Sequence, residues 1–208
     1  LLYLPQDGKQ IRHGSREEAV WIAKRIKQLA GSTHGHTLVL FTSYSLMGSV
    51  YQILRSDLPF PMVEVWRHTQ EEIMRFKTLE NAVLFAAGSC WEGVDFPGDM
   101  VSSLIIVRLP FAVPDPVREA EKEQYGNLRE YIEAVAVPDM QKKLRQGFGR
   151  AIRTETDTCV VTILDQRAVR GGRYYEDVLC ALPPCQMAES IEDVENFIRR
   201  RKNVDYYM

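Results

Sequence analysis

The sequence lacks the features of a membrane-bound or secreted protein. No apolar run approaches the ~20 residues that a membrane-spanning helix needs. The first ten residues, LLYLPQDGKQ, have no basic segment followed by an apolar core, so they do not form a signal peptide. We therefore expect a cytoplasmic protein without a membrane partner. An initiator methionine is also missing, and we expect the chain to be a fragment of a longer protein.

The sequence has no strong excess of charge of either sign. Its 208 residues carry a formal net charge of -2, with 45% hydrophobic and 26% charged residues. This composition is typical of a soluble globular protein, and the length fits one domain. Because the overall charge is slightly negative, any nucleic-acid site must be a local basic patch.

The sequence also has no pattern typical of a metal site. None of the four cysteines, Cys90, Cys159, Cys180 and Cys185, belongs to a C-x-x-C pair, so we predict buried, reduced thiols. Two of the four histidines, at positions 34 and 36, lie in a Gly/Thr-rich segment that we interpret as a solvated loop. We predict no metal ligands in this chain.

Short apolar runs alternate with helical patterns along the chain. Nearly continuous apolar residues, typical of strands buried on both faces, occupy 37–42, 62–66, 82–87, 103–109 and 158–165. Helix starts are indicated by Ser15 with Glu18, Thr69 with Glu72, Asp115-Pro116, Pro138-Asp139 and Ser190. The stretch from 115 to about 153 is longer than one crossover helix needs, so we expect a helical excursion from the sheet.

This alternation predicts an α/β fold in which helices flank a mainly parallel sheet. We expect one domain, with a lead-in loop and helix over 1–35, a core over 36–182 and a C-terminal helix over 183–208. Ligands of such sheets meet the carboxyl ends of the strands. The segments of interest are therefore TSYS, GSCWEGVDFPG, PFAVPDP and QRAVRGGR, each of which follows a predicted strand.

Two of these regions carry groups suited to chemistry. The segment 88–99 combines three glycines with Glu92 and Asp95, which a glycine turn could direct from one loop; an ordinary turn with solvated acids explains it equally well. Residues 142–153 hold five basic residues and no acid. If this stretch is helical, Arg150 and Arg153 share a face and suit a phosphate, although a solvated helix face is the simpler interpretation.

Taken together, four motifs resemble a known family. LVLFTSYSLM, GSCWEGVDFPG, IIVRLPFAVPDPV and QGFGRAIRTETD occur in this order and resemble the second motor domain of superfamily 2 DNA helicases. The similarity runs from about residue 36 to 182 and is greatest to the DinG branch, which is related to the XPD repair helicases. Gln146, Gly149, Arg150 and Arg153 resemble motif VI, residues 91–98 resemble motif V, and residues 40–44 resemble motif IV.

The resemblance implies a RecA-like fold and a nucleotide site shared between two motor domains. The N-terminal motor domain of the same parent chain would supply the phosphate-binding loop and the Mg²⁺ carboxylate. This chain would supply Arg150 and Arg153 to the γ-phosphate of ATP, with Arg153 as the preferred arginine finger. The resemblance places Gln146, Gly149, Glu92, Gly93 and Asp95 in the same ATP-binding cleft.

The resemblance also implies a surface for single-stranded DNA or a DNA fork. The residues that it places there are Ser43, Tyr44, Ser89, Trp91, Arg108 and Phe111. They would offer backbone contacts and stacking faces rather than base reading. The chain departs from the family at Cys90, where relatives usually carry phenylalanine, and at Ala87, where they often carry threonine.

No G-x-x-x-x-G-K-[ST] loop and no D-E-A-H-like box occur in these residues, so we expect half of an ATPase site and an inactive isolated domain. The four-iron cluster of some relatives belongs to the other motor domain, and we predict no iron–sulfur cluster here. Two other interpretations stay open. The chain could be a nucleic-acid-binding module with a helicase-like fold and no catalytic role, or a self-sufficient enzyme that uses Glu92 and Asp95 as acid and base.

Overall fold

The computed structural model describes residues 1–8, 11–66, 69–88, 96, 98–152 and 157–207. Within them, seven strands form one sheet in the order β3-β4-β2-β5-β6-β1-β7, and all neighbouring strands pair in parallel. The strands are β1 (Leu2–Tyr3), β2 (Thr37–Phe41), β3 (Met62–Glu64), β4 (Val83–Ala87), β5 (Ser103–Ile106), β6 (Val160–Ile163) and β7 (Met187–Ala188). The predicted α/β fold with a parallel sheet is therefore confirmed.

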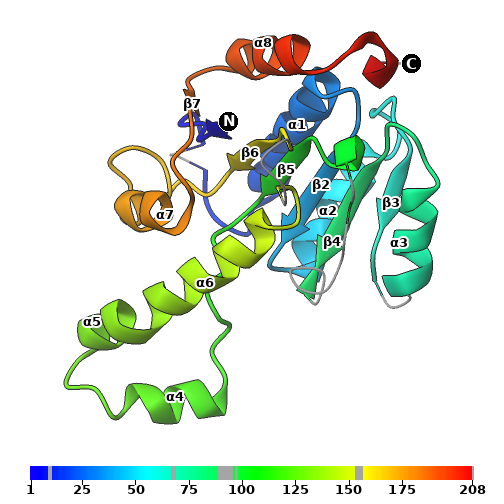
Figure 1. The fold of residues 1–208 in the computed structure, drawn as a ribbon. Coiled ribbons are helices and arrows are strands. Elements are labelled where there is room, and N and C mark those ends of the chain that lie inside the picture. The colour runs from blue at the N-terminus through cyan, green and yellow to red at the C-terminus, as the bar shows by residue number, and fades with distance from the viewer. Residues whose placement is uncertain (9–10, 67–68, 89–95, 97, 153–156, 208) are drawn as a thin grey trace.

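Helices cover both faces of this sheet (Figure 1). They are α1 (Arg16–Ser32), α2 (Tyr44–Leu54), α3 (Thr69–Lys77), α4 (Pro116–Lys122), α5 (Leu128–Tyr131), α6 (Val137–Phe148), α7 (Tyr175–Ala181) and α8 (Ile191–Arg201). Short 3₁₀ turns, η2 (Gly98–Met100) and η4 (Val204–Tyr207), complete the described elements with the π-helical turn η3 (Ile132–Ala136). No helix of the described residues is long and apolar enough to cross a membrane.

Alternating strand residues divide the core into two layers. Leu38 and Leu40 of β2 face a cluster that includes residues of α3, α6 and α7. Val39 and Phe41 of the same strand face the opposite cluster, which includes residues of α1, α2 and α8. Because both faces are covered, each residue of β2 is buried, which explains the continuous apolar runs of the sequence.

The predicted helical excursion is present and projects away from the sheet (Figure 1). Asp115 caps α4, as predicted, by accepting a hydrogen bond from the backbone N–H of Arg118 at 2.9 Å. Pro138 lies in the first turn of α6, as predicted, but α6 is not a separate helix start, because α5, η3 and α6 follow one another without a break. The π-helical turn precedes the proline and closes with a bond from Val137 N–H to the carbonyl of Ile132. Asp139 is not a cap; it pairs with Arg118 at 2.9 Å.

Of two other predicted helix starts, the one at Thr69 differs in detail and the one at Ser190 is confirmed. Thr69 is already the first residue of α3, and the carboxylate of Glu72 accepts from the backbone N–H of Trp66 at 3.0 Å. Ser190 caps α8 as predicted, and Asp193 completes its capping box.

The predicted solvated histidine loop is wrong. His36 stacks on Tyr206 with ring centroids 4.3 Å apart, and His34 meets Phe60 edge to face. Burial lowers the pKa of His36. The hydroxyl of Tyr206 donates to the carbonyl of Thr33 at 2.6 Å, so the C-terminal turn is fastened to the segment before β2.

Candidate functional site

The carboxyl ends of four neighbouring strands bring the predicted segments to one edge of the sheet. Ser43 follows β2, Gly88 follows β4, Arg108 follows β5, and Asp165 follows β6. Since β4, β2, β5 and β6 are parallel neighbours, these residues all lie along the same edge. We refer to it as the carboxyl edge.

Ser43 and Tyr44 lie at the start of α2. The Ser43 hydroxyl oxygen caps the helix by accepting from the backbone N–H of Leu46 at 3.4 Å. Tyr44 is 41% exposed, and its ring stacks on Trp66, which is itself 46% exposed, at a centroid distance of 5.6 Å. Trp66 was not predicted as a site residue, because its position after a short edge strand does not indicate contact with an aromatic ring of α2.

Gly88 fixes how closely Tyr44 approaches the end of β4. Its φ of +63° lies in the left-handed region, and a Cβ atom there would be 2.6 Å from the Tyr44 hydroxyl oxygen. Glycine is therefore required at this position for both its conformation and its lack of a side chain. The contact joins the segment after β2 to the segment after β4.

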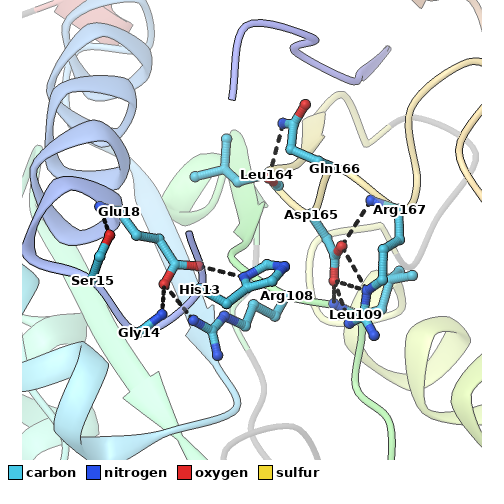
Figure 2. A network of polar contacts seen from close by, with 10 residues as sticks. All are labelled: His13, Gly14, Ser15, Glu18, Arg108, Leu109, Leu164, Asp165, Gln166 and Arg167. Carbon is cyan, nitrogen blue, oxygen red and sulfur yellow. Dashed lines mark hydrogen bonds and ion pairs between the residues drawn. The ribbon is translucent and has the colours of Figure 1, made fainter. Parts of the chain in front are cut away.

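Arg108 is held by a buried carboxylate (Figure 2). Glu18, whose side chain is 8% exposed, accepts hydrogen bonds from Arg108 at 2.5 Å and from the backbone N–H of Gly14 at 2.6 Å, and it contacts His13 Nδ1 at 2.9 Å. Burial alone would raise the pKa of Glu18. The hydrogen bonds from His13, Gly14 and Arg108 lower this pKa by more than burial raises it, so the net shift is downward. Glu18 is therefore ionised at neutral pH.

The predicted capping box at the start of α1 is only half present, because Glu18 does not play its part in it. Ser15 does accept from the backbone N–H of Glu18 at 3.1 Å, as a helix cap should. The Glu18 carboxylate, however, is taken up by Gly14, His13 and Arg108. The motif therefore starts α1 and also ties it to the end of β5.

A surface groove lies between the start of α1 and the start of α2. Its lining residues are hydroxyl-bearing, basic or small, with two apolar side chains: Gly14, Ser15, Arg16, Ala19, Ser43, Ser45, Leu46, Ser49, Ile53 and Arg108. The N-terminal residues of both helices line this groove together with Arg16 and Arg108, so its walls carry the partial positive charge of two helix N-termini and two guanidinium groups. The structure thus brings Ser43 and Arg108 together, as two of the predicted nucleic-acid-binding residues.

Phe111 lies beyond the end of β5, where it packs on Tyr174 at a centroid distance of 4.8 Å. The guanidinium carbon of Arg167 lies 5.1 Å from the centre of the Phe111 ring. The buried carboxylate of Asp165 orients Arg167 by accepting hydrogen bonds from its side chain, from Nη2 to Oδ2 at 2.7 Å and from Nε to Oδ1 at 3.0 Å and Oδ2 at 3.3 Å. Phe111 is thus half-buried within a small packed cluster.

The motif VI residues follow the buried face of α6. Met140 and Leu144 anchor this helix in the core, and α6 ends at Phe148. Arg150 therefore lies in a turn, where its backbone N–H donates to the carbonyl of Gly147 at 3.0 Å. Residues 149–152 are not helical, so the predicted continuation of the helix is wrong for them, and Arg150 does not lie on a helix.

Gln146, Gly149 and Arg150 are each half-buried at this end of α6. The other predicted site residues lie outside the described residues: Ser89, Trp91, Glu92, Gly93, Asp95 and Arg153. The same holds for Cys90. The structure therefore places only Arg150 of the two predicted catalytic arginines.

The described residues contain no group of three or more His, Cys, Asp or Glu side chains that could hold a metal ion. Cys159 is buried, and burial raises its pKa to about 12. Cys180 and Cys185 are exposed free thiols, so the prediction of buried thiols is wrong for these two.

Comparison with known proteins decides the family. A model of the helicase C-terminal domain matches residues 26–185, which include the segments that follow β2, β4, β5 and β6 but not the start of α1. The chain belongs to the helicase C-terminal domain family. Among curated relatives of this helicase domain, the ATP-dependent DNA helicase DinG of Photobacterium profundum is 38% identical over 181 residues, covering 76% of this chain and 25% of the relative.

Other relatives extend the likeness over nearly the whole helicase domain. The 3'-5' exonuclease DinG of Bacillus subtilis is 30% identical over 209 residues, covering 96% of this chain and 22% of the relative. The chain thus spans about a quarter of the length of these relatives. A solved XPD helicase structure superposes with a TM-score of 0.70 at 22% identity, covering 90% of this chain and 35% of the other. This likeness shows that the helicase domain has the RecA-like fold.

Proposed function

We propose that this chain is the C-terminal motor domain of an ATP-dependent DNA helicase and that ATP binds between it and an N-terminal motor domain of the same parent protein. The family match over residues 26–185 carries this proposal, because it spans motifs IV, V and VI in one fold. The relatives named as ATP-dependent DNA helicases support the choice of nucleotide and of DNA.

In the proposed site, the guanidinium groups of Arg150 and Arg153 approach the γ-phosphate when the two motor domains close. A fixed cation there stabilises the charge that develops as the phosphoryl group departs, and it can raise the rate by ~10³ or more. The anchoring of α6 by Met140 and Leu144 supports this role, since a finger needs a rigid base.

Gln146, Gly149, Glu92, Gly93 and Asp95 would line the same cleft. We assign the phosphate-binding loop and the Mg²⁺ ligands to the partner domain, because neither a phosphate loop nor a D-E-A-H-like box occurs in this sequence. The isolated chain should then bind nucleotide weakly and hydrolyse none.

The single strand would run along the carboxyl edge. The groove beside Ser43 and Arg108 supports this placement, with two helix N-termini and two arginines facing it. Tyr44 offers a partly exposed ring for stacking. Ser89, Trp91 and Phe111 complete the proposed surface. Opening after hydrolysis would move the two domains along the strand.

The decisive experiment replaces Arg153, and separately Arg150, by alanine in the full-length protein and measures DNA-stimulated ATP turnover. We expect a loss of at least ~100-fold with nucleotide and DNA binding retained. Arg145→Ala is the matched control, because Arg145 is an exposed cation of α6 that directly precedes the motif.

Unchanged turnover in both arginine variants would instead favour a nucleic-acid-binding module without a catalytic role. ATP hydrolysis by the isolated 208-residue chain would contradict the shared site and favour a self-sufficient enzyme.

A further inference from the structure

The turn after β6 is the most basic short segment of the carboxyl edge to which the proposed function assigns no role. Residues 166–173, QRAVRGGR, contain Arg167, Arg170 and Arg173. Asp165, directly before the turn, has its carboxylate committed to Arg167 and to the backbone N–H of Leu109. Arg170 and Arg173 are exposed. The turn thus presents positive charge to solvent at the edge where the single strand is placed.

This turn is a fixed structure. The backbone N–H of Gly172 donates to the carbonyl of Val169 at 2.7 Å, and that of Tyr174 donates to the carbonyl of Arg167 at 2.9 Å. A Cβ atom on Gly172 would lie 2.6 Å from the Arg167 carbonyl oxygen, so the turn closes tightly on itself. Arginines carried by such a turn lose less freedom on binding than arginines on a mobile loop.

Arg167 is the rigid centre of the turn. Its side chain is 41% exposed, while the Asp165 carboxylate that holds it is fully buried. Burial alone would raise the pKa of Asp165. The hydrogen bonds and charge of Arg167 and the N–H of Leu109 lower this pKa by more than burial raises it, so the net shift is downward. The resulting ion pair keeps the guanidinium over the Phe111 ring.

Side-chain contacts also connect the turn with the groove beside α2. A second groove is lined by residues of the turn and of the network around Glu18, including His13, Glu18, Gln166, Arg167 and Gly172. His13 and Glu18 belong to the network that holds Arg108, which lines the first groove. Figure 2 shows the two networks next to each other, joined through the consecutive residues Arg108 and Leu109.

We propose that the turn 166–173 is a second contact for the same single strand, so that the nucleic acid extends past Arg108 and its phosphates meet Arg170 and Arg173. This inference rests on the proposed function. The contact is to the phosphate backbone and carries no base preference, because exposed guanidinium groups of this kind recognise charge. This second contact increases the number of nucleotides of single-stranded DNA that the domain binds.

The test measures binding of oligothymidylates of about 6 to about 30 nucleotides to the full-length protein without nucleotide, by fluorescence anisotropy. The double variant Arg170→Ala/Arg173→Ala should bind the shortest strands as the wild type does. For the longest strands its affinity should fall about tenfold, and the slope of log K against log salt should become shallower by about 1.4, as expected for two lost phosphate contacts.

The control is Arg199→Ala/Arg200→Ala, which removes the same charge from two exposed residues of α8. The proposal is overturned if the turn variant binds long strands as tightly as this control does, or if it loses affinity equally for all lengths. Thermal unfolding establishes that both variants are folded. ATP turnover of Arg153→Ala tests the motor role separately, so a failed length dependence leaves that result intact.

Discussion

Replacing Glu18 by glutamine removes the charge that joins α1 to the end of β5. The variant keeps an oxygen for the backbone N–H of Gly14, but it turns an amide N–H toward the Arg108 guanidinium, 2.5 Å away in the native protein. Breaking one partner of a buried ion pair costs about 3–5 kcal/mol. Because the Arg108 side chain is 25% exposed, we expect the lower end, about 3 kcal/mol.

The effect should depend on pH in a defined direction. The pKa of Glu18 in the folded chain is below its ordinary value of 4.5. The carboxylate therefore stabilises the fold fully above that ordinary value, and the stabilisation is lost as the pH falls through the lower folded pKa. Glutamine does not titrate, so the wild type and the variant should converge in acid.

Urea unfolding of the 208-residue chain, followed by circular dichroism from neutral pH down to about pH 3, measures both quantities. A loss of about 3 kcal/mol corresponds to a Tm lowered by about 6–12 °C in a domain of this size. Glu17→Gln is the control, since Glu17 is the exposed neighbour in the same helical turn. Equal stability of the two variants at neutral pH, or a gap that does not narrow in acid, would refute the reasoning.

Two further predictions follow from single contacts. Gly88→Ala forces a positive φ on an L-residue and places a methyl group against the Tyr44 hydroxyl. The unfolding free energy should therefore fall by about 1–2 kcal/mol or more, and single-strand binding should weaken. An unchanged denaturation midpoint would argue against the contact. In the native chain, a thiol reagent near pH 8 should label Cys180 and Cys185, whereas buried Cys159, with a pKa raised to about 12, should stay unlabelled, as peptide mass mapping can measure.

The sequence was most informative where local pattern and burial agree. All five predicted strands are present, because a strand buried on two faces is apolar at nearly every position, as β4 is throughout and β2 is after Thr37. β1 and β7 were not predicted, since each has two residues and depends on a neighbour far away in the chain.

Side-chain partners were harder to predict than elements. Glu18 has the spacing of a capping box, but an arginine 90 positions later and a neighbouring histidine compete for its carboxylate. Pro138 looks like a helix start, yet the π-helical turn before it lets the helix continue. In the candidate site, the sequence predicted the placement of Ser43 and Arg108 at one edge, because parallel strands share a carboxyl edge. It could not predict the stacking of Trp66 on Tyr44.

The place of β1 between β6 and β7 has a consequence for how the domain assembles. Leu2 pairs with Val161 on one side and Met187 on the other, so β1 has no sheet neighbour until β6 has been synthesised. Pairings between residues so far apart in the chain are the kind that slows folding, because a long loop must close before they form. Removal of Leu2 and Tyr3 from a recombinant version of the domain would leave β7 without the strand that it pairs with. The start of α8, which directly follows β7, would then no longer be attached to the sheet through that strand.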